Sequence, residues 1–204
     1  MWTGALTSVD RVGLAHLMPG LDRSEQPGSF LQQQIPFRDP DGVLDVAADA
    51  VTLPGHALLS TALVVWLAWR LPGRRLAILT AFAGAVLVEI AFKHVITRPK
   101  VWVGDYHDPV FDNSFPSGHA TRIVFVALLA ATLRRRAAPW LAVWVAAALV
   151  LLEVDAFHLP TDIAGGVVLA LLAALLAGLL YPPFPLTRVG RTSWNRAPRG
   201  SAGS

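Results

Sequence analysis

Five long apolar runs dominate this sequence and constrain its fold more than any other feature. Each run carries few or no charges and approaches the roughly 20 residues that a helix needs to cross a bilayer. Only 15% of the 204 residues are charged, whereas a soluble domain averages about 25%. The sequence therefore predicts an all-α integral membrane helical bundle of about five to six transmembrane helices, with spans at residues 51–69, 76–96, 117–133, 137–152 and 163–180.

Composition divides the chain into three parts. Residues 1–42 are polar and acidic, and we expect an interfacial segment there. Two short amphipathic helices, at residues 9–21 and at residues 43–51, are expected to lie along the membrane surface. Residues 43–181 form the predicted membrane domain, and residues 182–204 form a basic cytoplasmic tail that we expect to be disordered. The lack of cysteine excludes disulfides and zinc–thiolate sites. No basic patch with aromatic residues favours nucleic-acid binding, and nothing indicates an oligomeric state.

Arginine is concentrated in alternate connections between the predicted spans. Residues 70–75, residues 134–136 and the tail together hold ten arginines and no acid. Because basic residues favour the cytoplasmic side of a membrane, residues 97–116 and 153–162 are expected to face outward. We therefore predict a multi-pass protein of the plasma (inner) membrane, with its active site on the outer face and its C-terminus in the cytoplasm.

The segment Phe115-Pro116-Ser117-Gly118-His119 joins an outward loop to an apolar run. Proline, serine and glycine in this order predict the start of a helix. A helix N-terminus offers unpaired N–H groups and the positive end of a dipole, which together favour an anion. His119 is placed to give that anion a proton. The alternative is an ordinary serine cap followed by a histidine without function.

Ionisable side chains inside spans are functional candidates because they are costly there. Glu89 and Lys93 are four residues apart, so we expect them to pair on one helical face. Lys93, Arg98 and Lys100 form a cationic group near the outer end of the same run, which suits an anion clamp. Ordinary snorkelling of basic side chains at a helix end is the alternative.

Arg122 is expected one helical turn below His119. A buried arginine there needs a partner, which is either an anionic ligand or a protein carboxylate. We favour a carboxylate such as Glu153 or Asp155.

His158 and Asp162 open the last predicted span, four residues apart. The negative charge of Asp162 either interacts favourably with the helix dipole, or Asp162 accepts a hydrogen bond from one nitrogen of His158. The second arrangement would fix the tautomer of His158 and make its other nitrogen a nucleophile. We interpret His56 and His94 as incidental.

These residues, in this order and spacing, resemble the type 2 phosphatidic acid phosphatase family. Its members are lipid phosphatases that share a helical core with vanadium-dependent haloperoxidases. The resemblance covers residues 43–181 and rests on Lys93 with Arg98-Pro99, on Pro116-Ser117-Gly118-His119, and on His158 with Asp162.

The resemblance implies a metal-independent hydrolase of phosphomonoesters or diphosphates that needs no cofactor. His158 would attack phosphorus and form a phosphohistidine, with Asp162 orienting its ring. His119 would protonate the leaving oxygen and then activate water. The non-bridging phosphate oxygens would be held by Ser117, the Gly118 amide and Lys93.

The sequence departs from the family pattern in two places. The first motif usually places Arg-Pro after six residues from its lysine; here that spacing reaches Lys100, and Arg98 comes after four. Either cation is a candidate for binding phosphate, and we favour Arg98 because a guanidinium can bind two oxygens. The third motif usually carries an arginine where Leu152 stands. Arg122 is our candidate to replace that arginine in space and to bind phosphate.

The leading interpretation is a membrane lipid phosphatase whose partners are the membrane and a lipid phosphate substrate. Polyprenyl diphosphates, phosphatidate, phosphatidylglycerol phosphate and polyprenyl sugar phosphates all belong to the implied class, and the sequence does not choose among them. The alternative is a catalytically inactive relative that binds anionic lipid or acts as a membrane scaffold, for which Leu152 is the main argument. The presence together of His119, His158 and Asp162 favours catalysis.

Overall fold

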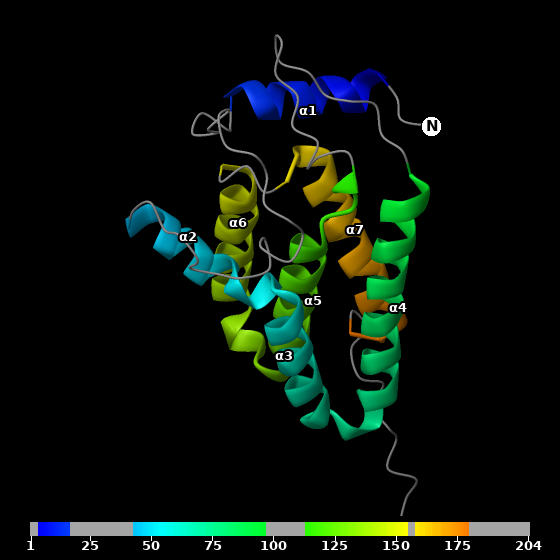
Figure 1. Ribbon diagram of the computed structural model, residues 1–204. Coiled ribbons are helices and arrows are strands. Elements are labelled where there is room, and N and C mark those ends of the chain that lie inside the picture. The colour runs from blue at the N-terminus through cyan, green and yellow to red at the C-terminus, as the bar shows by residue number, and fades with distance from the viewer. Residues whose placement is uncertain (1–3, 17–42, 97–112, 155–157, 180–204) are drawn as a thin grey trace, which may run out of the picture.

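The computed structural model describes residues 4–16, 43–96, 113–154 and 158–179. Within these ranges every regular element is a helix (Figure 1). The α-helices are α1 (Gly4–His16), α2 (Val43–Thr52), α3 (Ala57–Trp69), α4 (Arg75–Val95), α5 (Gly118–Leu133), α6 (Ala138–Val154) and α7 (Pro160–Leu176), with short 3₁₀ turns at Leu53–Gly55, Pro72–Arg74 and Arg135–Ala137.

The all-α prediction is confirmed, and α3 to α7 occur where the apolar runs predict spans. By length and hydropathy, Pro72–Val95 and Arg135–Val154 can each cross a membrane, and the bent pair Val46–Gly55 and Ala57–Trp69 passes the same test when taken together. The apolar helices α5 and α7 are shorter, with 16 and 17 residues. Their length is about 25 Å, against about 30 Å for a bilayer core. The chain folds as a membrane-type helical bundle.

The predicted span at residues 51–69 is not one continuous helix. The helical run is interrupted by the 3₁₀ turn Leu53–Gly55, and the helix axes on either side of the break differ by 51°. Pro54 has no N–H with which to continue the helical ladder. α2 instead packs against α6, where Trp144 Nε1 donates to the backbone oxygen of Val51 at 3.0 Å.

α5 forms the centre of the bundle, with α3, α4, α6 and α7 around it (Figure 1). Eleven of its 16 residues are buried, and Ile123, Phe125 and Leu129 are fully inaccessible. Gly166 of α7 lies against the start of α5, because a Cβ at this position would collide with the backbone oxygen of Ser117. This close approach brings the N-terminal ends of α5 and α7 together.

The outward faces of α4 and α6 are apolar. Only 22% and 11% of the residues in their most apolar windows are buried. The exposed side chains include Leu76, Leu87, Trp140 and Val143. Extended apolar surfaces on long helices suit contact with lipid rather than with water.

α1 lies across the end of the bundle at which α7 begins (Figure 1). The helix predicted at residues 9–21 overlaps α1, Gly4–His16, and the rest of the predicted range lies outside the described residues. The helix predicted at residues 43–51 corresponds to α2. The predicted tail, residues 182–204, lies outside the described residues.

Candidate active site

Two histidines meet at the end of the bundle over which α1 lies. His119 belongs to the first turn of α5, and His158 lies two residues before α7 begins at Pro160. Their ring centroids are 5.9 Å apart, and the two residues are 8% and 9% exposed. The close approach of α5 to α7 therefore places two imidazole rings in one largely buried site.

Ser117 is the N-cap of α5, so the predicted helix start is confirmed. Its backbone is extended (φ −65°, ψ 116°), and its Oγ accepts a hydrogen bond from Ala120 N at 3.1 Å. Its own N–H donates to the backbone oxygen of Asp162 at 2.9 Å, which ties the start of α5 to α7. The first turn of α5, beginning at Gly118, brings its N–H groups and the positive end of its dipole to the same site.

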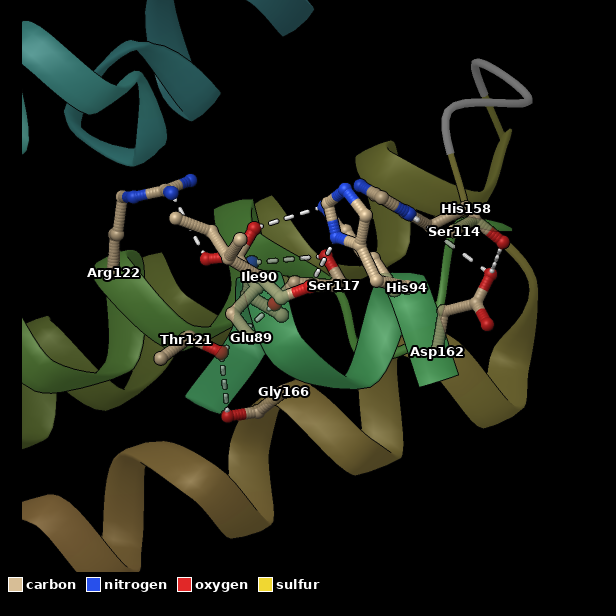
Figure 2. Close-up of polar contacts among 12 residues, drawn as sticks. Glu89, Ile90, His94, Ser114, Ser117, Thr121, Arg122, His158, Asp162 and Gly166 are labelled. Carbon is tan, nitrogen blue, oxygen red and sulfur yellow. Dashed lines mark hydrogen bonds and ion pairs between the residues drawn. The ribbon is translucent and has the colours of Figure 1, made fainter. Parts of the chain in front are cut away.

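Asp162 is fully buried, and several groups share its Oδ2. This oxygen accepts hydrogen bonds from Ser114 Oγ at 2.5 Å and from Leu159 N at 3.1 Å. It lies 4.0 Å from His158 Nδ1 (Figure 2), beyond the usual hydrogen-bond limit of about 3.2 Å. The hydrogen bond between Asp162 and His158, one of the two arrangements expected from the sequence, is therefore not formed between Nδ1 and Oδ2. Ser114 and the cap of α7 fix the position of this carboxylate oxygen. Nδ1 is the ring nitrogen of His158 that faces Asp162.

Glu89 of α4 binds two cations, Lys93 and Arg122, and Figure 2 shows its contact with Arg122. Its Oε1 lies 2.8 Å from Lys93 Nζ, which confirms the predicted pair. Its Oε2 lies 2.9 Å from Arg122 Nη2. The side chains of Glu89 and Arg122 are 5% and 11% exposed, and that of Lys93 is 21% exposed. Lys93 is thus the cation with better access to a ligand.

The carboxylate that binds Arg122 is Glu89 and not Glu153. α5 presents Arg122 to α4, whereas Glu153, at the end of α6, lies beside Gly13 of α1. Asp155, the other predicted partner, lies outside the described residues. The expectation of a protein carboxylate is confirmed, but the helix that supplies it was predicted wrongly.

Gly118 borders this charge cluster of Glu89, Lys93 and Arg122. A Cβ at Gly118 would collide with Glu89 Oε1 and would lie 2.5 Å from Arg122 Nη1. The cluster therefore packs on the first residue of α5. Two cations against one carboxylate leave a surplus of positive charge, which adds to that of the helix N-terminus. Lys93 and Arg122 are within electrostatic range of His119.

Two residues at the site were not identified from sequence patterns. Ser114 donates to Asp162, and His56, interpreted as incidental, packs edge-on against His119 with ring centroids 5.0 Å apart. Both lie in connections between helices, and no local pattern marks either of them. His94, in contrast, is exposed, and its Nδ1 lies 2.7 Å from the backbone oxygen of Ile90 in its own helix (Figure 2).

The remaining predicted phosphate ligands occupy different situations. Arg98 and Lys100 lie outside the described residues. Leu152 is 1% exposed and packs in one apolar cluster with Ala120 and Ile163. The position at which the family pattern carries an arginine therefore belongs to the apolar core in this chain.

Within the described ranges, no three His, Cys, Asp or Glu side chains converge as metal ligands would. A cavity of about 490 Å³ lies at the far ends of α5 and α7, where Arg70, Arg74 and Arg135 are among its lining residues. This cavity lies near the C-terminal ends of α5 and α7, whereas His119 and His158 lie at their N-terminal ends. We therefore place the candidate active site at the histidines and not at the cavity.

A family model described as the PAP2 superfamily matches residues 76–184, a region that runs from the second residue of α4 through α7 and includes the motifs with His119, His158 and Asp162. No curated protein and no solved structure matches the chain. Members of the superfamily are mostly phosphatases. Because the match spans more than half of the sequence, and the motifs point to the same family, this chain belongs to the PAP2 superfamily.

Proposed function

We propose that this protein is a membrane lipid phosphatase, which hydrolyses a lipid phosphomonoester or diphosphate through a phosphohistidine on His158 and without a metal. The observation that carries the proposal is the meeting of His119 and His158 beside the charge cluster at the N-terminus of α5. Membership of the PAP2 superfamily supports phosphatase-type activity in general. The lipid substrate and the histidine route are our inference from the site.

In the first step, Nε2 of His158 attacks phosphorus while the bond between phosphorus and the leaving oxygen breaks. His119 donates a proton to that oxygen, so the lipid product leaves as an alcohol or a monophosphate. The ring of His158 gains positive charge as it becomes phosphorylated. Asp162, 4.0 Å from Nδ1, stabilises this charge and orients the ring.

In the second step, His119 accepts a proton from a water molecule as the water oxygen attacks phosphorus. The bond between nitrogen and phosphorus breaks, inorganic phosphate leaves, and His158 returns to its neutral form. His119 is then protonated again and ready for another cycle. His119 thus serves as the general acid in the first step and as the general base in the second.

Phosphoryl transfer depends mainly on in-line positioning and on stabilisation of negative charge. A helix N-terminus and a cluster with surplus positive charge supply such stabilisation at this site. Arg122 would take the role of the arginine that Leu152 replaces. The groups that would hold the non-bridging oxygens are Ser117, the Gly118 amide, Lys93, Arg122 and either Arg98 or Lys100.

The proposed location of the site is the outer face of the plasma membrane. The arginine-bearing turns Pro72–Arg74 and Arg135–Ala137 lie at the opposite end of the bundle from the histidines, and basic residues favour the cytoplasmic side. A site near the membrane surface suits a substrate whose hydrocarbon tail stays in the bilayer while its phosphate reaches the histidines.

The experiment that tests the proposal measures phosphate release by the detergent-purified protein in the presence of EDTA. The substrates would be phosphatidate, phosphatidylglycerol phosphate, a polyprenyl diphosphate and a polyprenyl sugar phosphate. We expect release from at least one of them, with His158→Ala at background and His119→Ala lowered about 10²- to 10⁴-fold. Alkaline quenching with a ³²P-labelled substrate should trap label on the wild type and none on His158→Ala.

His94→Ala is the matched control, since His94 is an exposed histidine bonded to its own helix, and it should retain wild-type activity. Full activity in His158→Ala would refute the phosphohistidine route. Absence of phosphate release from every lipid, by a folded and monodisperse protein, would favour the inactive lipid-binding relative instead.

A further inference from the structure

α1 contacts the bundle with its polar and small residues. Asp10 of α1 is fully buried between this helix and the bundle, and Gly13 is also buried. The apolar residues Leu6, Val9 and Val12 face outward, at 39%, 50% and 57% exposure. A carboxylate is costly to bury unless hydrogen bonds or an opposite charge compensate it. The burial of Asp10 therefore requires a specific partner on the bundle.

That partner is Thr161, the second residue of α7. Asp10 Oδ1 accepts a hydrogen bond from Thr161 N at 3.1 Å, and Asp10 Oδ2 accepts one from Thr161 Oγ1 at 2.8 Å. The first N–H groups of a helix have no acceptor within the helix, and a negative charge there interacts favourably with the helix dipole. Asp10 thus caps α7 from another helix, 151 positions away in the sequence.

The contact between Asp10 and Thr161 lies next to the proposed catalytic residues in the chain. Thr161 directly precedes Asp162, whose own Oδ2 accepts from Leu159 N. Pro160 packs tightly under α1, since a Cβ at Gly13 would lie 2.5 Å from the Pro160 ring. The segment that carries His158 and Asp162 is therefore held by two carboxylates, one from α7 itself and one from α1.

We propose that Asp10 is a positioning residue that sets the geometry between His158 and Asp162. The inference rests on the proposed phosphatase function, because it concerns the same histidine. His158 Nδ1 and Asp162 Oδ2 are 4.0 Å apart, so about an ångström separates them from a hydrogen bond. Displacements of this size change rates by up to about 10²-fold. Because Asp10 fixes the first turn of α7, it controls the distance between Asp162 and His158, and with it how well Asp162 orients the nucleophile.

The kinetic test compares Asp10→Ala, Asp10→Asn and Thr161→Val with the wild type, using dioctanoyl phosphatidate and farnesyl diphosphate as substrates. Asp10→Ala should lower kcat about 10- to 100-fold and leave KM and the inhibition constant of inorganic phosphate unchanged. Asp10→Asn should largely restore kcat, because the amide oxygen still accepts from Thr161 N and the amide nitrogen can donate to Oγ1. Thr161→Val, which removes only the hydroxyl, should be intermediate.

Arg11→Gln is the matched control, since Arg11 is the next residue of α1 and is exposed; its kcat should equal that of the wild type. Rates are expressed per folded protein, from size-exclusion chromatography and thermal melts. A variant Asp10→Ala that melts earlier but keeps the wild-type kcat would overturn the inference and leave Asp10 a purely structural cap. A rise in KM at unchanged kcat would overturn it as well.

A second measurement is independent of turnover. In the NMR spectrum of protein labelled with ¹⁵N-histidine, the ring signals of His158 are assigned by their loss in His158→Ala. Asp10→Ala should shift these signals, and Arg11→Gln should not. Shifted signals without any phosphate release by the wild type would refute the proposed function alone. Unchanged signals and unchanged kcat in an active enzyme would refute the inference alone.

Discussion

Arg122 of α5 and Glu89 of α4 form a buried ion pair, in which Nη2 and Oε2 are 2.9 Å apart. Lys93 binds the other oxygen of the same carboxylate at 2.8 Å. A buried charge is stable only when it is paired, so the three side chains act as one electrostatic unit. Substitutions can separate the contribution of this unit to stability from its proposed contribution to phosphate binding.

Glu89→Gln should lower the free energy of unfolding by about 3–5 kcal/mol, because it leaves Arg122 buried without its carboxylate. Lys93→Met should lower it by about 1 kcal/mol or less, because Lys93, at 21% exposure, is the more accessible partner. Denaturant unfolding in detergent, followed by circular dichroism, measures both values. Equal losses for the two variants would contradict burial as the source of the difference.

Gly118→Ala should destabilise the protein by about 1–3 kcal/mol, because the added Cβ collides with the Glu89 carboxylate and crowds Arg122. The matched control is Gly84→Ala on α4, where a Cβ meets no atom within 4 Å. That variant should gain about 0.5–1 kcal/mol, since alanine favours a helix more than glycine does. Thermal unfolding compares the two. A Gly118→Ala protein as stable as Gly84→Ala would mean that the charge cluster does not pack on α5.

Ser114→Ala removes the hydroxyl that donates to Asp162 Oδ2 at 2.5 Å. We expect kcat to fall about 10-fold, because a hydrogen bond to a charged group contributes about 1.5–3 kcal/mol and its loss frees the carboxylate to turn away from His158. Initial rates with dioctanoyl phosphatidate measure the effect. Thr80→Ala is the control, since this exposed hydroxyl bonds only within α4. A higher rate in Ser114→Ala would instead show that Ser114 competes with His158 for Asp162.

The double variant Arg122→Gln with Glu89→Gln removes both members of the most buried ion pair, so that the one charge left in the cluster is that of Lys93, the more accessible cation. If Arg122 binds phosphate in place of the arginine missing at Leu152, the inhibition constant of inorganic phosphate should rise about 10-fold or more. Glu89→Gln alone keeps the guanidinium and should bind phosphate at least as tightly as the wild type. Competitive inhibition assays measure the inhibition constant of phosphate for both variants. The same constant in the double variant and in Glu89→Gln would exclude Arg122 from phosphate binding.

Leu152→Arg should not restore the family pattern. Leu152 is 1% exposed and packs with Ala120 and Ile163, so an arginine there would bury a charge among apolar groups. We expect a large loss of stability, or no folded protein, with no gain in phosphate affinity. A stable variant that binds phosphate more tightly would mean that position 152 can reach the site after all. Yield, melting temperature and phosphate inhibition provide the measurements.

Local sequence patterns were sufficient to predict much of the fold. The apolar runs predicted the helices α3 to α7, and the order of proline, serine and glycine at residues 116–118 predicted a helix start where α5 begins. The spacing of Glu89 and Lys93 predicted their pair. Each of these features depends on residues within about one or two helical turns of one another, where helix geometry fixes the distances. The predicted span at residues 51–69 is interrupted at Leu53–Gly55, because Pro54 cannot continue the hydrogen-bond ladder of the helix.

The sequence by itself thus determined the class of fold and the family, and it predicted the residues that we propose for phosphate hydrolysis. Only the tertiary structure decided which of the distant residues meet: Glu89 with Arg122, Ser114 with Asp162, and Asp10 with Thr161, at separations of 33, 48 and 151 positions. The physical reason is that helix periodicity specifies which residues share a face, but not which helix that face contacts. That choice follows from packing of the whole bundle, in which Gly166 admits α5 against α7 and Gly13 admits α1 against Pro160.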